Sequence, residues 1–124
     1  MYRIFLVEDS APVRQRVLEM LASIRGVKTI GSASTARDAE QAILEMQPDA
    51  VLLDINLAQG SGFDVLRSLR KHAPLIEIYM LSNFATPPYR DRAADLGANG
   101  FFDKTTEIER LRQTMAQRAA QFTH

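Results

Sequence analysis

The chain has 124 residues, 46% of them hydrophobic and 24% charged, which is the composition of one ordinary globular domain. Its 15 basic and 15 acidic residues balance, so its charge does not indicate nucleic acid or a membrane surface as a direct partner. The absence of cysteine excludes disulfides, thiolate metal sites and thiol redox chemistry. No apolar segment is long enough for a signal peptide or a membrane span, and we expect a cytoplasmic protein.

Short apolar runs alternate with helical patterns along the whole chain. Five runs bounded by turn residues predict strands at residues 4–7, 27–31, 50–54, 76–81 and 100–103. The run at 27–31 is the weakest and is expected nearer an edge of the sheet. Apolar residues at helical spacing predict a helix after each strand, with buried faces that include Val13, Val17, Met20 or Leu21, Ile24, Ala39, Ala42, Ile43, Met46, Phe63, Leu66, Leu69, Ile108, Leu111, Met115 and Ala119.

Local signals predict where the first two helices begin and end. Ser10 and Pro12 are expected to open the first helix, and Gly26 to end it. Thr35 and Asp38 resemble a capping box at the start of the second helix. The third helix is expected at residues 62–70.

The last two helices follow different signals. Pro87 and Pro88 belong to a stiff connection, so we expect a short fourth helix at residues 89–96. Glu109 is placed to complete a capping box for a last helix that starts near Thr106.

Five β-α units in one domain of residues 1–124 predict an α/β fold, a three-layer sandwich around a five-stranded parallel sheet. Right-handed crossovers bring the carboxyl ends of all strands to one edge of the sheet. Ligands bind at this edge in open α/β sheets. The polar residues expected there are Glu8, Asp9, Asp54, Ser82 and Lys104.

These residue types favour one kind of chemistry. Three carboxylates in one place repel one another, which raises their pKa values unless a cation neutralises them. Oxygen ligands without His or Cys suit a hard cation, so we expect Mg²⁺ or Mn²⁺. A carboxylate beside such an ion can act as a nucleophile toward phosphorus. Lys104 is then suited to bind one phosphoryl oxygen, and Ser82 to donate a hydrogen bond to another.

Over essentially its whole length, the sequence resembles a response regulator receiver domain of two-component signalling. The residues that carry the resemblance are the pair Glu8-Asp9, Asp54 after Val51-Leu52-Leu53, Ser82 after Met80-Leu81, and Lys104 after Phe101-Phe102-Asp103. The resemblance implies a doubly wound, flavodoxin-like (βα)5 arrangement. It also implies that Asp54 is the phosphoacceptor for a sensor histidine kinase or a histidine phosphotransfer protein.

Further roles follow from the same resemblance. Asp9, Asp54 and the backbone carbonyl of Asn56 would bind Mg²⁺ directly, and Glu8 would act through water. Phe101 would be the switch aromatic. The domain would not be an enzyme beyond its own phosphorylation and dephosphorylation, and it would act on an unknown downstream protein. Because the chain ends about one helix after Lys104, we expect no attached output domain.

The resemblance also predicts how the switch works. A phosphoryl group on Asp54 would draw in the Ser82 hydroxyl, which is expected on a loop that can move. Phe101 would rotate into the space left beside the fourth strand and so alter the surface of the fourth helix, fifth strand and fifth helix. Tyr89 is a candidate contact for a partner on that surface.

The sequence departs from the family pattern at several places. Ala58 and Thr105 stand where family members usually carry proline. A cis bond before a residue other than proline costs about 3 kcal/mol, so the sequence does not fix the geometry of the Lys104–Thr105 bond. Phe101 replaces a frequent tyrosine and cannot form a hydrogen bond through its ring.

Two other functions need residues that this chain lacks. A phosphohydrolase of the haloacid dehalogenase type needs a second Asp where this chain has Asn56. A flavodoxin-like electron carrier needs a phosphate loop rich in Ser, Thr and Gly, but the first loop here begins Glu8-Asp9. A phosphate relay or sink without its own output, and an interaction module that does not use its acids, stay open.

The remaining polar and aromatic residues are assigned to the surface or the core. We expect His72 and His124 to be solvated, as well as a helix face with Arg110, Arg112 and Arg118. Phe102, Met80 and Met115 are expected to pack in the core, and Phe101 and Phe102 to face opposite layers.

Overall fold

The computed structural model describes residues 1–122, which form one five-stranded sheet with helices on both faces. All neighbouring strands are parallel, in the order β2-β1-β3-β4-β5. The strands are β1 (Tyr2–Val7), β2 (Val27–Ala33), β3 (Ala50–Asp54), β4 (Glu77–Ser82) and β5 (Gly100–Asp103). The helices are α1 (Ala11–Ala22), α2 (Ala36–Met46), α3 (Gly62–His72), α4 (Pro87–Asp95) and α5 (Ile108–Gln121).

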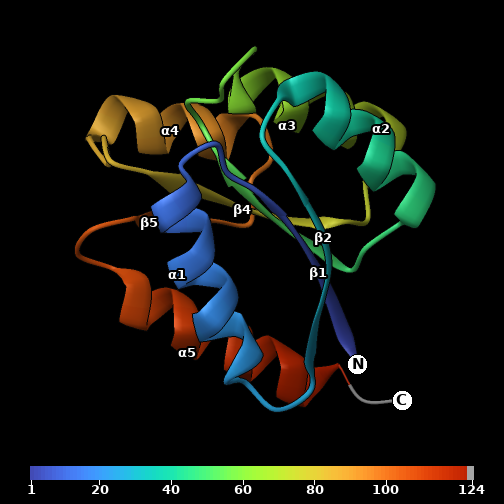
Figure 1. Ribbon diagram of the computed structural model, residues 1–124. Helices are drawn as coiled ribbons and strands as arrows, with labels where there is room; N and C mark the ends of the chain where they lie inside the picture. Colours follow the sequence, from blue (N-terminus) through green and yellow to red (C-terminus); the bar gives the residue numbers. More distant parts are fainter. Residues whose placement is uncertain (123–124) are drawn as a thin grey trace.

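The sheet separates two apolar cores, as Figure 1 shows. Helices α1 and α5 cover one face, and α2, α3 and α4 cover the other. The predicted three-layer, doubly wound sandwich is therefore confirmed, and β2 does lie at an edge. Among residues 1–122, none of the helices combines the length and apolar character that a membrane span requires.

Adjacent aromatic residues of β5 face different cores. Phe102 is buried on the side of α1 and α5, whereas Phe101 is half-buried against the core on the side of α4. Met80 and Met115 are fully buried. All of these placements agree with the prediction from strand alternation and helical spacing.

Helix α1 begins as predicted but ends earlier than expected. The Ser10 hydroxyl accepts a hydrogen bond from the Val13 N–H (3.4 Å). The helix stops at Ala22 because Ser23 and Ile24 form tight turns back to the carbonyls of Met20 and Leu21. The prediction that Gly26 ends this helix was therefore wrong. With φ +86°, it instead turns the chain into β2.

The second helix starts at the predicted cap. The Thr35 hydroxyl accepts the Asp38 N–H (3.2 Å), so the N–H group at the start of α2 has a partner. The apolar face is narrower than predicted, because Ala39 and Ile43 are buried whereas Met46 is exposed.

The starts of α4 and α5 differ from the prediction. Pro87 and Pro88 are the first two residues of α4, since proline lacks an N–H that the first turn leaves unpaired. Helix α5 starts at Ile108, and Glu109 pairs with Arg112 instead of completing a capping box.

A partly buried hydrogen-bond cluster lies at the amino-terminal ends of the strands, opposite the ends that carry the polar site residues. The Glu77 carboxylate accepts hydrogen bonds from the hydroxyls of Tyr2 (2.9 Å) and Tyr79 (2.8 Å) and from Nε and Nη2 of Arg118 (2.8 Å each). Burial raises the Glu77 pKa, but these hydrogen bonds outweigh burial and hold the pKa below its usual range.

This cluster corrects one surface prediction and leaves the others in place. Arg118 is not part of a solvated face, because it is fixed to Glu77 across the end of the sheet. Arg110 is an exposed residue paired with Glu107, and His72 is exposed as predicted. His124 lies outside the described residues.

The lowered pKa of Glu77 predicts a pH-dependent stability. A lowered folded-state pKa stabilises the fold above the unfolded value of about 4.3, and this contribution is lost as the pH falls through the folded-state pKa. We expect Glu77→Gln to be less stable than wild type at pH 7, with a difference that shrinks below about pH 4. Urea unfolding of both proteins from pH 7 to pH 3, with exposed Glu45→Gln as control, measures this. A difference that stays constant over the range would contradict it.

Candidate functional site

Four strands end at one rim of the sheet with a polar side chain. Asp54 and Ser82 are the last residues of β3 and β4, while Glu8 and Lys104 directly follow β1 and β5. The parallel register places Val7 beside Leu53, Asp54 beside Leu81 and Ser82 beside Asp103, so the strand ends are level. The structure thus brings the predicted site residues together.

Most of these side chains are buried. The exposed fraction is 0% for Glu8, 2% for Asp54, 1% for Ser82 and 5% for Lys104, while Asp9 is exposed. Charged side chains are rarely buried to this degree unless they are paired. The rim is therefore a desolvated cluster of polar side chains with one carboxylate, that of Asp9, open to solvent.

Lys104 is the counter-ion of the two buried carboxylates. Its Nζ lies 2.7 Å from Glu8 Oε1 and 2.9 Å from Asp54 Oδ2. Burial raises the pKa of the Asp54 carboxyl, which the Lys104 hydrogen bond opposes and the charge of Glu8 reinforces. Burial alone would lower the pKa of Lys104, but its contacts to Glu8 and Asp54 outweigh burial and raise it.

Backbone groups hold the other carboxylate oxygens. The Ser10 N–H donates to Glu8 Oε2 (3.0 Å), and the Asn56 N–H donates to Asp54 Oδ1 (3.2 Å). Arg14 donates to the carbonyl of Glu8 (3.1 Å). From the sequence, Ser10 is predicted only to open the first helix, and nothing in the pattern indicates a role for Arg14. Both acids are consequently fixed at one oxygen while the other faces Lys104.

The acidic residues fit a divalent metal ion. Glu8, Asp9 and Asp54 each offer a carboxylate oxygen, and these oxygens lie within 4.8 Å of one another. Within residues 1–122, Glu8 Oε1 and Asp54 Oδ2 have no hydrogen-bond partner apart from the Lys104 ammonium, so lone pairs remain for a further ligand. Oxygen-only ligands suit Mg²⁺ or Mn²⁺. A role for the Asn56 carbonyl stays a prediction.

Ser82 is fixed more firmly than the sequence suggested. It belongs to β4, pairs with Asp103 and accepts the Phe84 N–H at its hydroxyl (2.8 Å). The expectation that Ser82 lies on a movable loop was wrong, because the strand extends one residue further and the loop starts at Asn83. The hydroxyl proton remains available for donation to a ligand.

Gly62, which the sequence predicted correctly as the start of the third helix, also supports the site. A Cβ on Gly62 would lie 2.2 Å from the carbonyl oxygen of Asp54, and its N–H donates to the Ile55 carbonyl (2.8 Å). Only glycine therefore lets the start of α3 pack against the end of β3.

Backbone hydrogen bonds hold the loop between Asp54 and α3, although Ala58 stands where the family usually has proline. The Ala58 N–H, which a proline would lack, donates to the Ser34 carbonyl (3.2 Å), and the Gln59 carbonyl accepts the Ala36 N–H (2.9 Å). These bonds tie the loop to the connection between β2 and α2.

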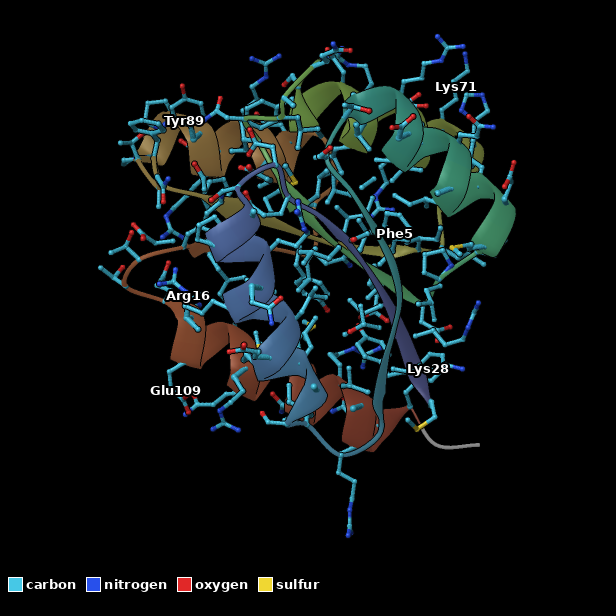
Figure 2. The ribbon with its side chains drawn as sticks, viewed as in Figure 1. Phe5, Arg16, Lys28, Lys71, Tyr89 and Glu109 are labelled. Atoms are coloured by element: carbon cyan, nitrogen blue, oxygen red, sulfur yellow. The ribbon has the colours of Figure 1, made fainter. Side chains whose placement is uncertain are left out.

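The segment after Lys104 is held by side chains. Residues 1–122 contain no cis peptide bond, so the Lys104–Thr105 bond is trans. Arg16 donates to the carbonyl of Lys104 (3.1 Å), and Figure 2 shows its side chain on the side of α1 toward the start of α5. The Asp103 carboxylate accepts the N–H groups of Thr105 (2.7 Å) and Thr106 (3.1 Å).

The predicted switch and contact residues lie on or beside α4. The guanidinium carbon of Arg90 lies 5.1 Å from the centre of the Phe101 ring. Tyr89, at the outer end of α4 in Figure 2, is 39% exposed and stacks on Phe63 with ring centres 6.1 Å apart. Tyr89 is thus available to a partner but partly held by α3.

Comparison with known proteins identifies similar sequences. Residues 4–116 match the family model described as "Response regulator receiver domain". The chain is 32% identical to the uncharacterized transcriptional regulatory protein YvfU of Bacillus subtilis, over 90% of this chain and 56% of that protein. It is 28% identical to the response regulator GacA of Pseudomonas aeruginosa, over 94% of this chain and 55% of that protein. The chain thus spans slightly more than half the length of these relatives.

A solved structure gives the same picture of the fold. The response regulator domain of CheB from Thermotoga maritima superposes with a TM-score of 0.85 and 23% identity, over 98% of this chain and 95% of that one. At this identity, the likeness supports the shared fold alone.

The acidic rim predicts metal-dependent stability. Mg²⁺ should bind the folded site only and therefore raise the melting temperature with concentration. Asp9→Asn should melt no lower than wild type without metal, because Asp9 is exposed, but should gain much less from Mg²⁺. Thermal melts at increasing Mg²⁺ test this, with the exposed α4 residue Asp91, changed to Asn, as control. A wild-type melting temperature unaffected by millimolar Mg²⁺ would exclude the metal site.

Proposed function

Because the chain belongs to the response regulator receiver domain family, we propose that Asp54 is its phosphoacceptor. The phosphoryl donor is a phosphohistidine of a sensor histidine kinase or a histidine phosphotransfer protein. One observation carries this proposal: Asp54 ends the central strand with Lys104 at 2.9 Å and two more acids within 4.8 Å. Asp54 is the buried carboxylate on the strand that pairs directly with β4, which carries Ser82, whereas Glu8 follows β1 on the other side of β3.

The proposed reaction is a phosphoryl transfer between nitrogen and oxygen. A carboxylate oxygen of Asp54 attacks phosphorus and forms the new O–P bond, while the N–P bond to the donor imidazole breaks. The electron pair of that bond stays on the imidazole nitrogen. Lys104 favours the ionised carboxylate that this attack requires. Mg²⁺ bound by Glu8, Asp9 and Asp54 would offset the negative charge of the approaching phosphoryl group.

Two further residues would bind the transferred group. Lys104 lies beside Asp54 Oδ2 already and would share its charge with a phosphoryl oxygen. The Ser82 hydroxyl, on the adjacent strand, would donate its proton to another phosphoryl oxygen. Both groups are buried and held by backbone contacts, so little reorganisation precedes the transfer.

The output would be a changed protein-binding surface. Ser82 binds the Phe84 N–H, so a pull on its hydroxyl reaches the loop at residues 83–86 even though Ser82 itself lies in β4. Phe101 lies on the neighbouring strand and would respond with α4, β5 and α5. This contact favours a signalling role over a phosphate relay or sink, which needs no change in that surface.

The proposal predicts a single labelled residue. Acetyl phosphate with Mg²⁺ should add one phosphoryl group to the chain, located on Asp54 by mass spectrometry of peptides and removed by hydroxylamine as expected of an acyl phosphate. Asp54→Ala should lose the label, and the exposed α4 variant Asp95→Ala should keep it. Undiminished labelling of Asp54→Ala would show that another residue is the acceptor.

A further inference from the structure

Glu107, just before α5, closes the segment that carries Lys104. Its Oε1 accepts the Asp103 N–H (2.9 Å), and its own N–H donates to the Asp103 carbonyl (3.0 Å). The two bonds fasten both ends of residues 103–107. Because Lys104 lies inside this closed segment, the position of its backbone depends on Glu107.

The same carboxylate is bound by an arginine of α4. Arg90 Nη2 donates to Glu107 Oε1 (2.6 Å). Arg90 also donates to the carbonyls of Ala85 (3.0 Å) and Phe101 (3.2 Å), and its guanidinium lies over the Phe101 ring. One planar group thus contacts the loop after β4, the strand β5 and the segment that holds Lys104.

Together these bonds form a continuous path across the molecule. It runs from the Ser82 hydroxyl through the Phe84 N–H to the adjacent Ala85 carbonyl, and from there through Arg90 to Glu107. A partly exposed ion pair contributes little to stability by itself. The planar Arg90 guanidinium, however, donates hydrogen bonds to three segments at once, so a shift of Glu107 would bear on the Ala85 loop and on β5.

We propose that Glu107 is a positioning residue for Lys104, and that its pair with Arg90 couples the lysine segment to α4 and Phe101. This inference rests on the proposed phosphorylation of Asp54. When Lys104 is drawn to the phosphoryl group, the closed segment moves with it and carries the Glu107 carboxylate. Arg90 follows its counter-ion, which shifts both the Ala85 loop and the face that covers the Phe101 ring.

The two roles of Glu107 can be separated by substitution. Glu107→Gln keeps an oxygen that accepts the Asp103 N–H but removes the charge that holds Arg90. Arg90→Met removes the guanidinium and leaves the segment closed. Glu107→Ala removes both contacts, and Glu107→Asp shortens the reach of the carboxylate by one carbon. Glu109→Gln is the matched control. Glu109 pairs with Arg112 three residues further on, as Glu107 pairs with Arg110, but Glu109 touches no part of this path.

The experiment titrates each full chain with beryllofluoride and Mg²⁺ and records amide chemical shifts. We expect Glu107→Ala to lose affinity for beryllofluoride on the order of tenfold, and Glu107→Asp to lose affinity in the same direction. Arg90→Met and Glu107→Gln should bind within about fivefold of wild type but transmit much smaller shifts to Phe101 and α4. Glu109→Gln should behave as wild type.

Different results would contradict the positioning role of Glu107 and its coupling to α4. Wild-type affinity in Glu107→Ala, or in Glu107→Asp if the alanine variant does not fold, would overturn the positioning role. Full-size shifts at Phe101 and α4 in both Arg90→Met and Glu107→Gln would overturn the coupling. Failure of the wild type itself to bind beryllofluoride would instead count against the proposed phosphorylation.

Discussion

The contact of the Lys104 ammonium with two buried carboxylates is the constraint on which the rest of the site depends. Burying Glu8 and Asp54 without a cation would cost several kcal/mol for each ion. The parallel sheet solves this by bringing the ends of β1, β3 and β5 to one rim, where Lys104 reaches both acids. Gly62 lies outside these strands but supports the same rim, because the absence of a side chain lets the start of α3 pack against the Asp54 carbonyl.

The charge balance of this rim also explains what it can bind. Three carboxylates and one ammonium leave two formal negative charges, which a divalent cation would neutralise. A phosphoryl group on Asp54 would carry about two negative charges in place of the single charge of the carboxylate, so the rim would gain about one negative charge. Lys104 and Ser82 are the nearby groups that can bind the phosphoryl oxygens. Because those groups connect through Phe84, Arg90 and Glu107 to α4 and α5, a change of charge at the rim has a physical path to the surface.

The sequence predicts the strands and the rim well because both depend on local patterns. Buried runs such as residues 50–54 identify strands, and parallel topology then determines which residues meet. Arg90, Glu107 and Arg118 could not be found in this way, since a charged residue on a helix looks the same whether it faces solvent or pairs with a distant strand. The exact ends of helices and strands were the other feature that the sequence predicted wrongly. Pro88 is compatible both with the end of a connection and with the first turn of a helix. Strand β4 is one residue longer than predicted, so Ser82 is fixed in the strand instead of lying on a loop.

The central claim is that Lys104 balances the charges of Glu8 and Asp54, and a double-mutant cycle in unfolding free energy tests it most directly. Without Mg²⁺ at pH 7, we expect Lys104→Met to lose about 3 kcal/mol, because it leaves two buried carboxylates without a counter-ion. Adding Glu8→Gln to that variant should recover part of the lost unfolding free energy. In the wild-type background, Glu8→Gln alone should lower the unfolding free energy or leave it unchanged. Strictly additive effects of the two substitutions would contradict the account.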